Sequence, residues 1–255
     1  MLKKRLIGVI VIKDSWAVQS FGYGRYLPLG RPEHLAENLD RWGADEILVL
    51  SVDRSSRGLG PDFRALRRLS AMGLSTPLTY GGGIHTAEQA VAVIQAGAER
   101  ICIDAALRGR HETIRDMASL IGAQALIAAL PLSTDGDRMF SYDYRSKQSA
   151  PLDKNHCSLF AEGVISEALI IDWRHEGQRN SFDMDLIRLF PCVGVPLIIF
   201  GGLSEPAQLA AALGNPRVVA AGVGNFLSYS EHAIQRLKKE LMNASLRPPV
   251  YVGSK

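Results

Sequence analysis

The sequence predicts an α/β fold, and within that class a closed (β/α)8 barrel built from two half-barrel repeats. Eight short apolar runs alternate along the 255 residues with longer amphipathic stretches, which is the order of a parallel sheet covered by helices. The runs are continuously apolar, as expected for strands that are buried on both faces. The phrase TPLTYGGGI returns in the second half of the chain as VPLIIFGGL, with Pro77 and Pro196 separated by 119 positions. A repeat of this length indicates an internal duplication.

The apolar runs give the expected strands, and the amphipathic stretches give the expected helices. The strands are Leu6–Ile12, Ile47–Val52, Pro77–Tyr80, Ile101–Ile103, Leu126–Leu130, Ala168–Ile171, Pro196–Phe200 and Val218–Ala221. The clearest helices are Pro32–Gly43, Asp62–Gly73, His85–Glu99, His111–Gly122 and Ser204–Gly214. A doubly wound open sheet is the competing architecture. Two halves of four strands close naturally into one ring, so we expect a single barrel over residues 1–255, with repeats at about 1–120 and 121–245.

One region does not fit the alternation of strands and helices. Ser133–Asn155 is too polar and too rich in turn residues to belong to the core. We expect a long loop here, containing a hairpin in the segment RMFSYDYRSKQSAP, on the side of the fifth strand.

Composition excludes several classes of function. The formal net charge is only +3, and the cations are scattered, so no nucleic-acid partner is expected. No run of 18 apolar residues occurs, and the apolar part of the N-terminus is too short for a signal peptide. We therefore expect a cytoplasmic protein with no membrane partner. Cys102, Cys157 and Cys192 are widely separated, which favours free buried thiols over a disulfide or a zinc site. No metal site and no cofactor are predicted.

Glycines follow two strands of the repeat, at the barrel end where functional sites lie. Gly81–Gly83 end the third strand, and Gly201–Gly202 end the seventh. Backbone amides ahead of a helix attract anions, so we expect phosphate binding at Gly82, Gly83, Gly201, Gly202 and Gly222. The alternative is that the glycines only form tight turns. Asp104 lies beside the first pair and would repel a phosphate, which makes the second pair the better candidate.

A charged residue stands immediately before four of the strands, at the opposite end of the barrel. These residues are Arg5, Glu46, Arg100 and Glu167. Ordered by strand number, their signs alternate, so facing carboxylates and guanidinium groups should pair and close this end. Ordinary strand-entry charges are the alternative explanation.

The chain resembles, over nearly its whole length, the cyclase subunit of imidazole glycerol phosphate synthase. The matching segments are KRLIGVIVIKD, GADEILVLSVD, TYGGGIHTAEQA, AGAERICID, EALIIDWRHEGQRNSFD and AAGVGNF. The resemblance implies a duplicated half-barrel that binds a phosphorylated small molecule with two phosphates. It also implies that a glutaminase subunit docks at the opposite barrel end and supplies ammonia. The four rim charges then correspond to an ammonia gate, and Glu99 to a contact with the glutaminase.

The catalytic positions depart from the family. The resemblance places its two catalytic aspartates at Val11 and Pro131. Neither side chain can carry a proton, and general acid–base assistance is worth roughly 10²–10⁴-fold. The resemblance also predicts a lysine where Gln19 stands, and a phosphate-binding asparagine where Asp104 stands.

Other acids near the strand ends are candidates to replace the lost pair. Asp172 and Glu176 are the best placed, with Asp53 and His175 nearby. The alternative explanation is that they are loop acids that are solvated or that hold neighbouring arginines.

The rim that would receive ammonia keeps its charges, whereas the face that would perform cyclisation lacks its acids. This pattern resembles a branch in which a cyclase-like barrel and a glutaminase supply ammonia to a sugar-amidating protein of surface-polysaccharide (O-antigen) synthesis. We therefore expect an ammonia-conducting barrel whose partners are a glutaminase and a sugar amidotransferase. Two alternatives stay open: a cyclase of histidine biosynthesis with displaced acids, and a non-catalytic scaffold that binds a phosphate ligand.

Overall fold

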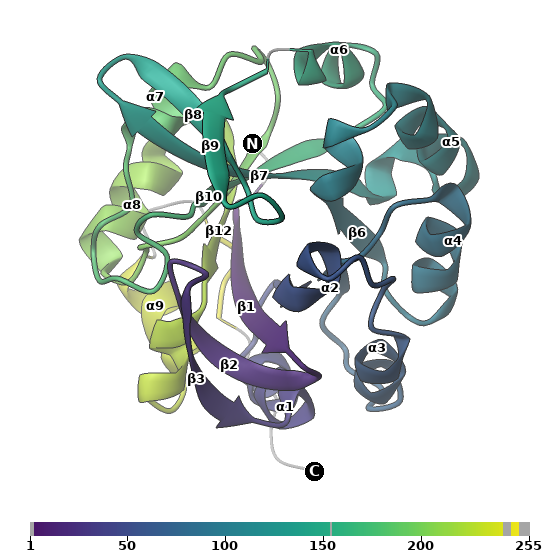
Figure 1. The fold of residues 1–255 in the computed structure, drawn as a ribbon. Coiled ribbons are helices and arrows are strands. Elements are labelled where there is room, and N and C mark those ends of the chain that lie inside the picture. The colour runs from purple at the N-terminus through teal and green to yellow at the C-terminus, as the bar shows by residue number, and fades with distance from the viewer. Residues whose placement is uncertain (1–2, 154, 242–245, 250–255) are drawn as a thin grey trace.

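Eight parallel strands form a closed barrel in the computed structural model, which describes residues 3–153, 155–241 and 246–249. The barrel strands are β1 (Arg5–Lys13), β4 (Glu46–Ser51), β5 (Leu78–Gly81), β6 (Arg100–Ile103), β7 (Leu126–Asp135), β10 (Glu167–Asp172), β11 (Leu197–Phe200) and β12 (Val218–Val223). Neighbours along the chain pair in parallel, and the ring closes where β12 pairs with β1 (Figure 1). The predicted (β/α)8, or TIM, barrel is confirmed, and the open sheet is wrong.

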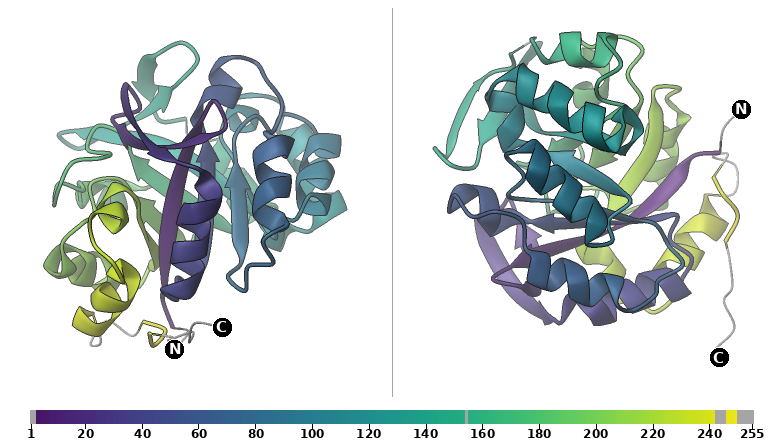
Figure 2. Two further views of the ribbon diagram at one scale, coloured as in Figure 1. Left: turned by 90° about the horizontal axis from the view of Figure 1, so that it is seen from below. Right: turned by 90° about the vertical axis from the view of Figure 1, so that its right-hand side faces the viewer.

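Helices surround the barrel, as the two side views show (Figure 2). They are α1 (Pro32–Arg41), α2 (Val52–Ser56), α3 (Phe63–Ser70), α4 (Ala87–Gln95), α5 (His111–Ile121), α6 (His156–Ala161), α7 (Asp185–Leu189), α8 (Pro206–Gly214) and α9 (Ala233–Glu240), with 3₁₀ turns η1 (Ala105–Arg108), η2 (Ala123–Ala125) and η3 (Asn225–Tyr229). The five helices expected from amphipathic patterns are all present. Within the described residues, no helix has the length and apolarity needed to cross a membrane.

Two hairpins extend from the C-terminal end of the barrel. One is β2 (Trp16–Phe21) with β3 (Arg25–Gly30), and the other is β8 (Arg138–Asp143) with β9 (Gln148–Pro151). The second was expected in the polar region, but the first was not. Its connection to β1 runs through Asp14 and Ser15, which both have positive φ (50° and 61°). Tight hairpin turns of this kind usually contain glycine or asparagine. Asp14 and Ser15 are neither, so the sequence did not indicate a hairpin here.

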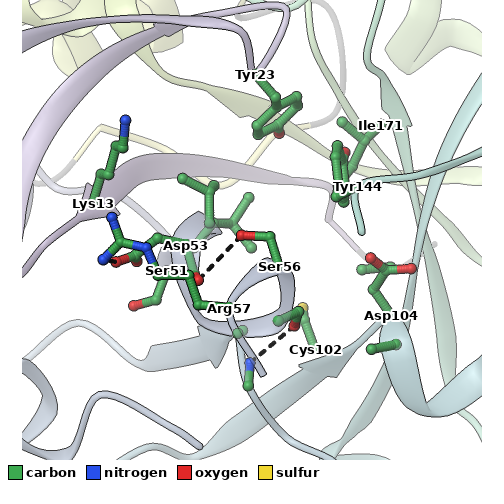
Figure 3. Close-up of a pocket in the computed structure, with 18 of the residues that line it drawn as sticks. Lys13, Tyr23, Ser51, Asp53, Ser56, Arg57, Cys102, Asp104, Tyr144 and Ile171 are labelled. Atoms are coloured by element: carbon green, nitrogen blue, oxygen red, sulfur yellow. Dashed lines mark hydrogen bonds and ion pairs between the residues drawn. The ribbon is translucent and has the colours of Figure 1, made fainter. Parts of the chain in front are cut away.

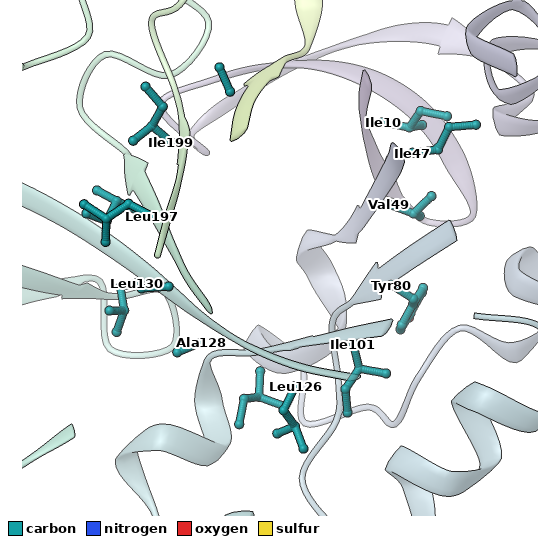
Figure 4. Packing of buried hydrophobic residues seen from close by; sticks show 14 of the residues in the cluster. Ile10, Ile47, Val49, Tyr80, Ile101, Leu126, Ala128, Leu130, Leu197 and Ile199 are labelled. Carbon is teal, nitrogen blue, oxygen red and sulfur yellow. The ribbon is translucent and has the colours of Figure 1, made fainter. Parts of the chain in front are cut away.

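The core has two layers because successive side chains of each strand point to opposite faces. On β4, Ile47 and Val49 belong to the layer between sheet and helices, as Figure 4 shows. Leu48 and Leu50 of the same strand belong to the separate cluster that fills the barrel lumen. Both faces are therefore apolar, which explains why the strand sequences are continuously hydrophobic.

The cysteine prediction is wrong for two of the three residues. Cys157 on α6 and Cys192 after α7 form a disulfide, with their Cα atoms 5.1 Å apart. Cys102 is a free, buried thiol as expected. The two bridged cysteines are 35 residues apart in the chain, and only the packing of α6 beside the segment before β11 brings them together.

Candidate functional site

A cavity of about 460 Å³ opens at the C-terminal end of the barrel (Figure 3). Its floor is made by lumen side chains that also line the cavity, among them Leu50, Cys102 and Ile171. Its walls come from the segments that follow β4, β5 and β6 and from the turns of both hairpins. The volume lies within the roughly 300–1,000 Å³ of small-molecule sites. The functional end predicted from the barrel topology therefore carries a cavity.

The two glycine pairs adopt the same turn, but only one of them reaches this cavity. Gly82 and Gly83 have φ of 127° and 71°, and Gly201 and Gly202 have φ of 103° and 75°. A Cβ on Gly82 would lie 2.4 Å from the Ser51 carbonyl oxygen, and one on Gly201 would lie 2.5 Å from that of Asp172. A positive φ together with such close contact to a neighbouring carbonyl oxygen requires glycine. Gly82 and Gly83 line the cavity, whereas Gly201 and Gly202, like Gly222, are buried outside its lining.

The β2–β3 hairpin lies across the end of β11, the strand that Gly201 follows. The Ser20 amide donates to Asn225 Oδ1 (3.2 Å), and Asn225 Nδ2 donates to the Ser20 carbonyl (2.7 Å). The Gly22 amide donates to the Glu176 carbonyl (2.9 Å). Asn225 follows β12 and Glu176 follows β10, and β11 lies between these two strands. The hairpin therefore bridges both neighbours of β11.

Glu176 fastens this hairpin and is not part of the cavity lining. The side chain is buried, and its Oε2 accepts from Ser20 Oγ (2.9 Å) and the Tyr23 amide (3.4 Å). Burial raises the pKa of Glu176 to about 7, opposed by these hydrogen bonds. The structure thus gives this candidate acid a buried position that joins two loops.

Asp172 also holds a loop. Its Oδ2 accepts from the Asp183 amide (2.8 Å) and lies 2.7 Å from His175 Nδ1. Burial raises the pKa of Asp172, and the hydrogen bond from Asp183 opposes the rise. Neither Asp172 nor His175 lines the cavity.

Two other carboxylates do line the cavity. Burial raises the pKa of Asp104 to about 6, and the nearest cation, Arg108, lies 3.7 Å away. Asp53 is held differently, because its Oδ2 accepts from the Asp14 amide (3.2 Å) and lies 3.4 Å from Arg57 Nη1. The carboxylate of Asp53 therefore already has two partners within the chain.

An aromatic wall completes the cavity, and sequence reasoning missed it. Tyr23 comes from the β2–β3 turn, and Tyr142 and Tyr144 come from β8 and the turn after it. The rings of Tyr23 and Tyr144 have centroids 5.0 Å apart, and Tyr142 stacks on Trp173 at 4.0 Å. The segments FGYGRY and FSYDYR hold an unusual share of aromatics for polar turns, which was the available signal.

The two positions of the lost catalytic acids face the lumen by strand alternation. Val11 pairs in register with Leu50 of β4, and Pro131 pairs with Ile171 of β10. Both are buried. Since Leu50 and Ile171 form part of the cavity floor, the two positions lie at the level of that floor, and neither side chain there can exchange a proton.

The four rim charges converge at the N-terminal end of the lumen and form one alternating ring. Arg5 Nη2 lies 2.9 and 2.8 Å from the two carboxylate oxygens of Glu167, and Arg5 Nη1 lies 3.4 Å from Glu46 Oε2. Arg100 Nη1 lies 2.7 Å from Glu167 Oε2 and 3.8 Å from Glu46 Oε2. Each cation thus contacts both carboxylates, as the alternation of signs predicts, and the ion pairs close the ring.

Further contacts fix the ring in place. Thr79 Oγ1 donates to Glu46, and Arg100 donates to Ser166 Oγ and the Gln124 carbonyl at 3.1 Å each. The four ring side chains are between 4 and 17% exposed. Glu99, beside the ring on the outer surface, is exposed.

A single apolar layer separates this ring from the floor of the cavity. On β4, Glu46 belongs to the ring, Leu48 to the layer, and Leu50 to the cavity floor. Leu169 holds the same intermediate position on β10, between Glu167 and Ile171. The lumen therefore links a charged closure at one end to the cavity at the other.

Comparisons of the sequence with known proteins identify the family of this chain. A family model described as "Histidine biosynthesis protein" matches residues 5–233. A provisionally named imidazole glycerol phosphate synthase subunit, hisF2, from Vibrio vulnificus is 30% identical over 248 residues, which cover 96% of this chain and 91% of the relative. A protein of the same name from Campylobacter jejuni is 29% identical over 248 residues (94% and 96%). Imidazole glycerol phosphate synthase subunit HisF of Bacillus licheniformis is 28% identical over 245 residues (94% and 97%). The chain belongs to the histidine biosynthesis protein family, among its HisF-like cyclase subunits and their hisF2 relatives.

Proposed function

We propose that this chain is the ammonia-conducting barrel of a glutamine amidotransferase complex and that it does not cyclise a substrate itself. A glutaminase docks at the ion-pair ring, and a sugar-amidating protein receives ammonia at the cavity end. One observation carries the proposal. The closed ring at the N-terminal end is complete, whereas Val11 and Pro131 occupy the two positions where the family resemblance puts the acid and base.

The chemistry of the lumen suits neutral ammonia. Closed ion pairs between Arg5, Glu46, Arg100 and Glu167 leave no free charge to attract ions from solvent. Behind them, side chains such as Leu48 and Leu169 form an apolar layer. An ammonium ion would lose its hydration there at a cost of several kcal/mol, whereas neutral ammonia would lose far less.

The ring is coupled to the outer surface where a partner would dock. Arg100 bonds the segment before β10 through Ser166, and its chain neighbour Glu99 is exposed. A cation of the glutaminase that pairs with Glu99 would pull on the start of β6. Rotation of the Arg100 guanidinium away from Glu167 would then open the ring.

The lining acids do not restore a cyclase site. An acid and a base must both exchange protons with the substrate. Asp104 is suited to this by its pKa of about 6, but Asp53 is occupied by Arg57 and the Asp14 amide. The geometry thus offers one proton-exchanging carboxyl where two are needed.

The test is reconstitution of the barrel with a HisH-type glutaminase of the same organism. We expect a stable complex in which the barrel stimulates glutamine hydrolysis by at least tenfold. Glu99→Lys should abolish binding, whereas Glu112→Lys, an exposed glutamate at the other end of the barrel, should leave it unchanged. Absence of binding by the unmodified barrel, or binding without stimulation, would contradict the proposal.

Transfer of ammonia to the sugar-amidating protein is tested by comparing glutamine with ammonium salts as the nitrogen source. With the sugar-amidating protein present, glutamine and ammonium salts should both support amidation by the intact complex. With Glu99→Lys, only ammonium salts should do so. Amidation from glutamine that is unaffected by this substitution would show that ammonia takes another route.

A further inference from the structure

The disulfide lines a groove at the same end of the barrel as the ion-pair ring. The groove has a volume of about 330 Å³, and both Cys157 and Cys192 border it, together with Ser166 and Pro196. Ser166 and Pro196 directly precede β10 and β11, so the groove opens at the N-terminal end. Cys157 is partly exposed, whereas Cys192 is buried. Small thiols can therefore reach the bridge, and exposed disulfides are typically the labile, regulatory ones.

The groove adjoins the ring through the start of β10. Arg100 Nη2 donates to Ser166 Oγ (3.1 Å), and Ser166 Oγ donates to the Leu126 carbonyl (2.9 Å). The next residue, Glu167, contacts both cations of the ring. One residue of the groove lining is therefore also a hydrogen-bond partner of the ring.

Backbone hydrogen bonds tie both halves of the bridge to this same segment. On the α6 side, the Val164 amide donates to the Leu159 carbonyl (2.9 Å), two residues after the first cysteine. On the other side, the Ala168 amide donates to the Pro196 carbonyl (3.0 Å), four residues after the second cysteine. The disulfide thus joins the two flanks of residues 164–168, which include the ring carboxylate.

Reduction of the bridge would release one part of this surface and leave another anchored. Arg217 donates to the carbonyls of Cys192 (2.8 Å) and Phe190 (3.2 Å), so the first part of the loop before β11 stays in place. Helix α6 is only six residues long, and helices this short depend on tertiary packing. The parts released are therefore α6 and the turn that carries Val193, whose side chain is 94% exposed.

A glutaminase centred on the ring would cover this surface. A specific interface buries roughly 800 Å² on each partner, which is more than four ring side chains can supply, and the groove adjoins the ring. With the bridge intact, α6 and the turn are already ordered before docking. With the bridge reduced, docking has to order them, which lowers the affinity.

We propose that the Cys157–Cys192 disulfide is a redox switch of glutaminase docking, with the bridged form binding tightly and the reduced form weakly. The inference rests on the proposed function, because it concerns the regulation of the docking surface assigned there. The reductant is a low-molecular-weight thiol, and the disulfide of that thiol restores the bridge by the reverse reaction.

The switching step is thiol–disulfide exchange. The thiolate of a first small thiol attacks the more exposed Sγ, that of Cys157; the S–S bond breaks, and Cys192 leaves as a thiolate and takes up a proton. The thiolate of a second small thiol attacks the sulfur of the bound one, which leaves as a small-molecule disulfide, and Cys157 is released and protonated. Two electrons and two protons thus pass from two thiols to the bridge.

The test is calorimetric titration of the full chain with a HisH-type glutaminase of the same organism, at several ratios of reduced to oxidised glutathione. Alkylation followed by mass spectrometry gives the bridged fraction at each ratio. We expect the bridged chain to bind about tenfold more tightly than the reduced chain, and the affinity to follow the bridged fraction. Binding is the readout because thiols could alter glutamine hydrolysis by acting on the glutaminase itself.

Variants separate the switch from other effects of thiols. The double variant Cys157→Ser, Cys192→Ser cannot form the bridge and should bind like the reduced chain at every ratio, with its fold checked by circular dichroism. Ser158→Ala changes an exposed residue of α6 beside the bridge and should keep the full response.

Two kinds of failure can be told apart. The switch would be overturned, and the docking left intact, by equal or tighter binding of the reduced chain. The same holds if glutathione reduces the bridge only after urea has unfolded the chain. Absence of binding in the bridged form as well would contradict the docking itself, and the switch with it.

Discussion

Replacing Glu167 by glutamine should destabilise the barrel strongly, because this carboxylate holds both cations of the ring. It lies 2.8–2.9 Å from Arg5 Nη2 and 2.7 Å from Arg100 Nη1, and its side chain is only 15% exposed. Glutamine has nearly the same shape but no charge, so two half-buried guanidinium groups would share Glu46 alone. Breaking a buried ion pair from one side costs about 3–5 kcal/mol. Since these groups keep some contact with water, we expect about 3 kcal/mol.

A second arginine–glutamate pair in the same chain provides the control. Arg115 contacts Glu162 through Nε and Nη2 at 2.9 and 3.0 Å, so the geometry is as good as in the ring. These side chains are 46% and 42% exposed, and exposed pairs contribute at most about 1 kcal/mol. Glu162→Gln should therefore have a small effect although it removes the same kind of contact.

Thermal and urea unfolding, followed by circular dichroism, distinguish these outcomes. A loss of about 3 kcal/mol lowers the Tm of a domain of this size by roughly 6–12 °C, whereas Glu162→Gln should shift it by no more than about 3 °C. Equal shifts for the two variants would refute the reasoning, because burial and sharing of the carboxylate would then have no effect.

Three further results are expected. Burial raises the pKa of Glu176 from 4.5 to about 7; the folded state therefore holds the proton more tightly, and its stability should fall by up to about 3 kcal/mol as the pH rises from 4.5 to 7. Glu176→Gln should flatten this dependence in urea titrations at several pH values. Reduction of the Cys157–Cys192 disulfide, which closes 35 residues, should lower stability by about 3–4 kcal/mol, measured as the Tm with and without reductant. Co-expression of the chain with its glutaminase should fail to rescue a histidine auxotroph, since Val11 and Pro131 carry no proton.

Each of these results has a contradicting outcome. If the stability of Glu176→Gln depended on pH as that of the unmodified chain does, the Glu176 carboxyl would not be the group that titrates. Cys157→Ser should make the Tm insensitive to reductant, and a variant that still responds would exclude the disulfide as the cause. If co-expression of the unmodified chain and its glutaminase allowed the auxotroph to grow, the chain would be a cyclase of histidine biosynthesis.

Much of the barrel could be predicted because its signals are local. Continuous apolarity in runs such as Ile47–Val52 follows directly from burial of both strand faces. The alternating ring could be predicted for the same reason. A charge immediately before a strand must lie at the N-terminal rim, and the order of the strands then fixes the order of the signs. The lack of an acid and a base at Val11 and Pro131 could be predicted as well, because valine and proline side chains cannot exchange a proton however they pack.

The cavity could not be predicted to the same degree, because distant contacts decide it. The sequence shows two equivalent glycine pairs and favoured the second, yet the cavity is lined by the first. The difference arises from the bonds of Ser20 with Asn225, 205 positions apart. The pairing of Cys157 with Cys192 depends in the same way on how α6 packs.

By itself, the sequence determined the closed barrel, the charges at its N-terminal rim and the absence of the family's two acids. Each of these depends on strand period and residue chemistry, which are properties of short segments. The tertiary structure alone decided which half of the mouth is open and that Tyr23 and Tyr144 line it. Those features depend on where two hairpins fold back, and long-range hydrogen bonds and packing fix that position.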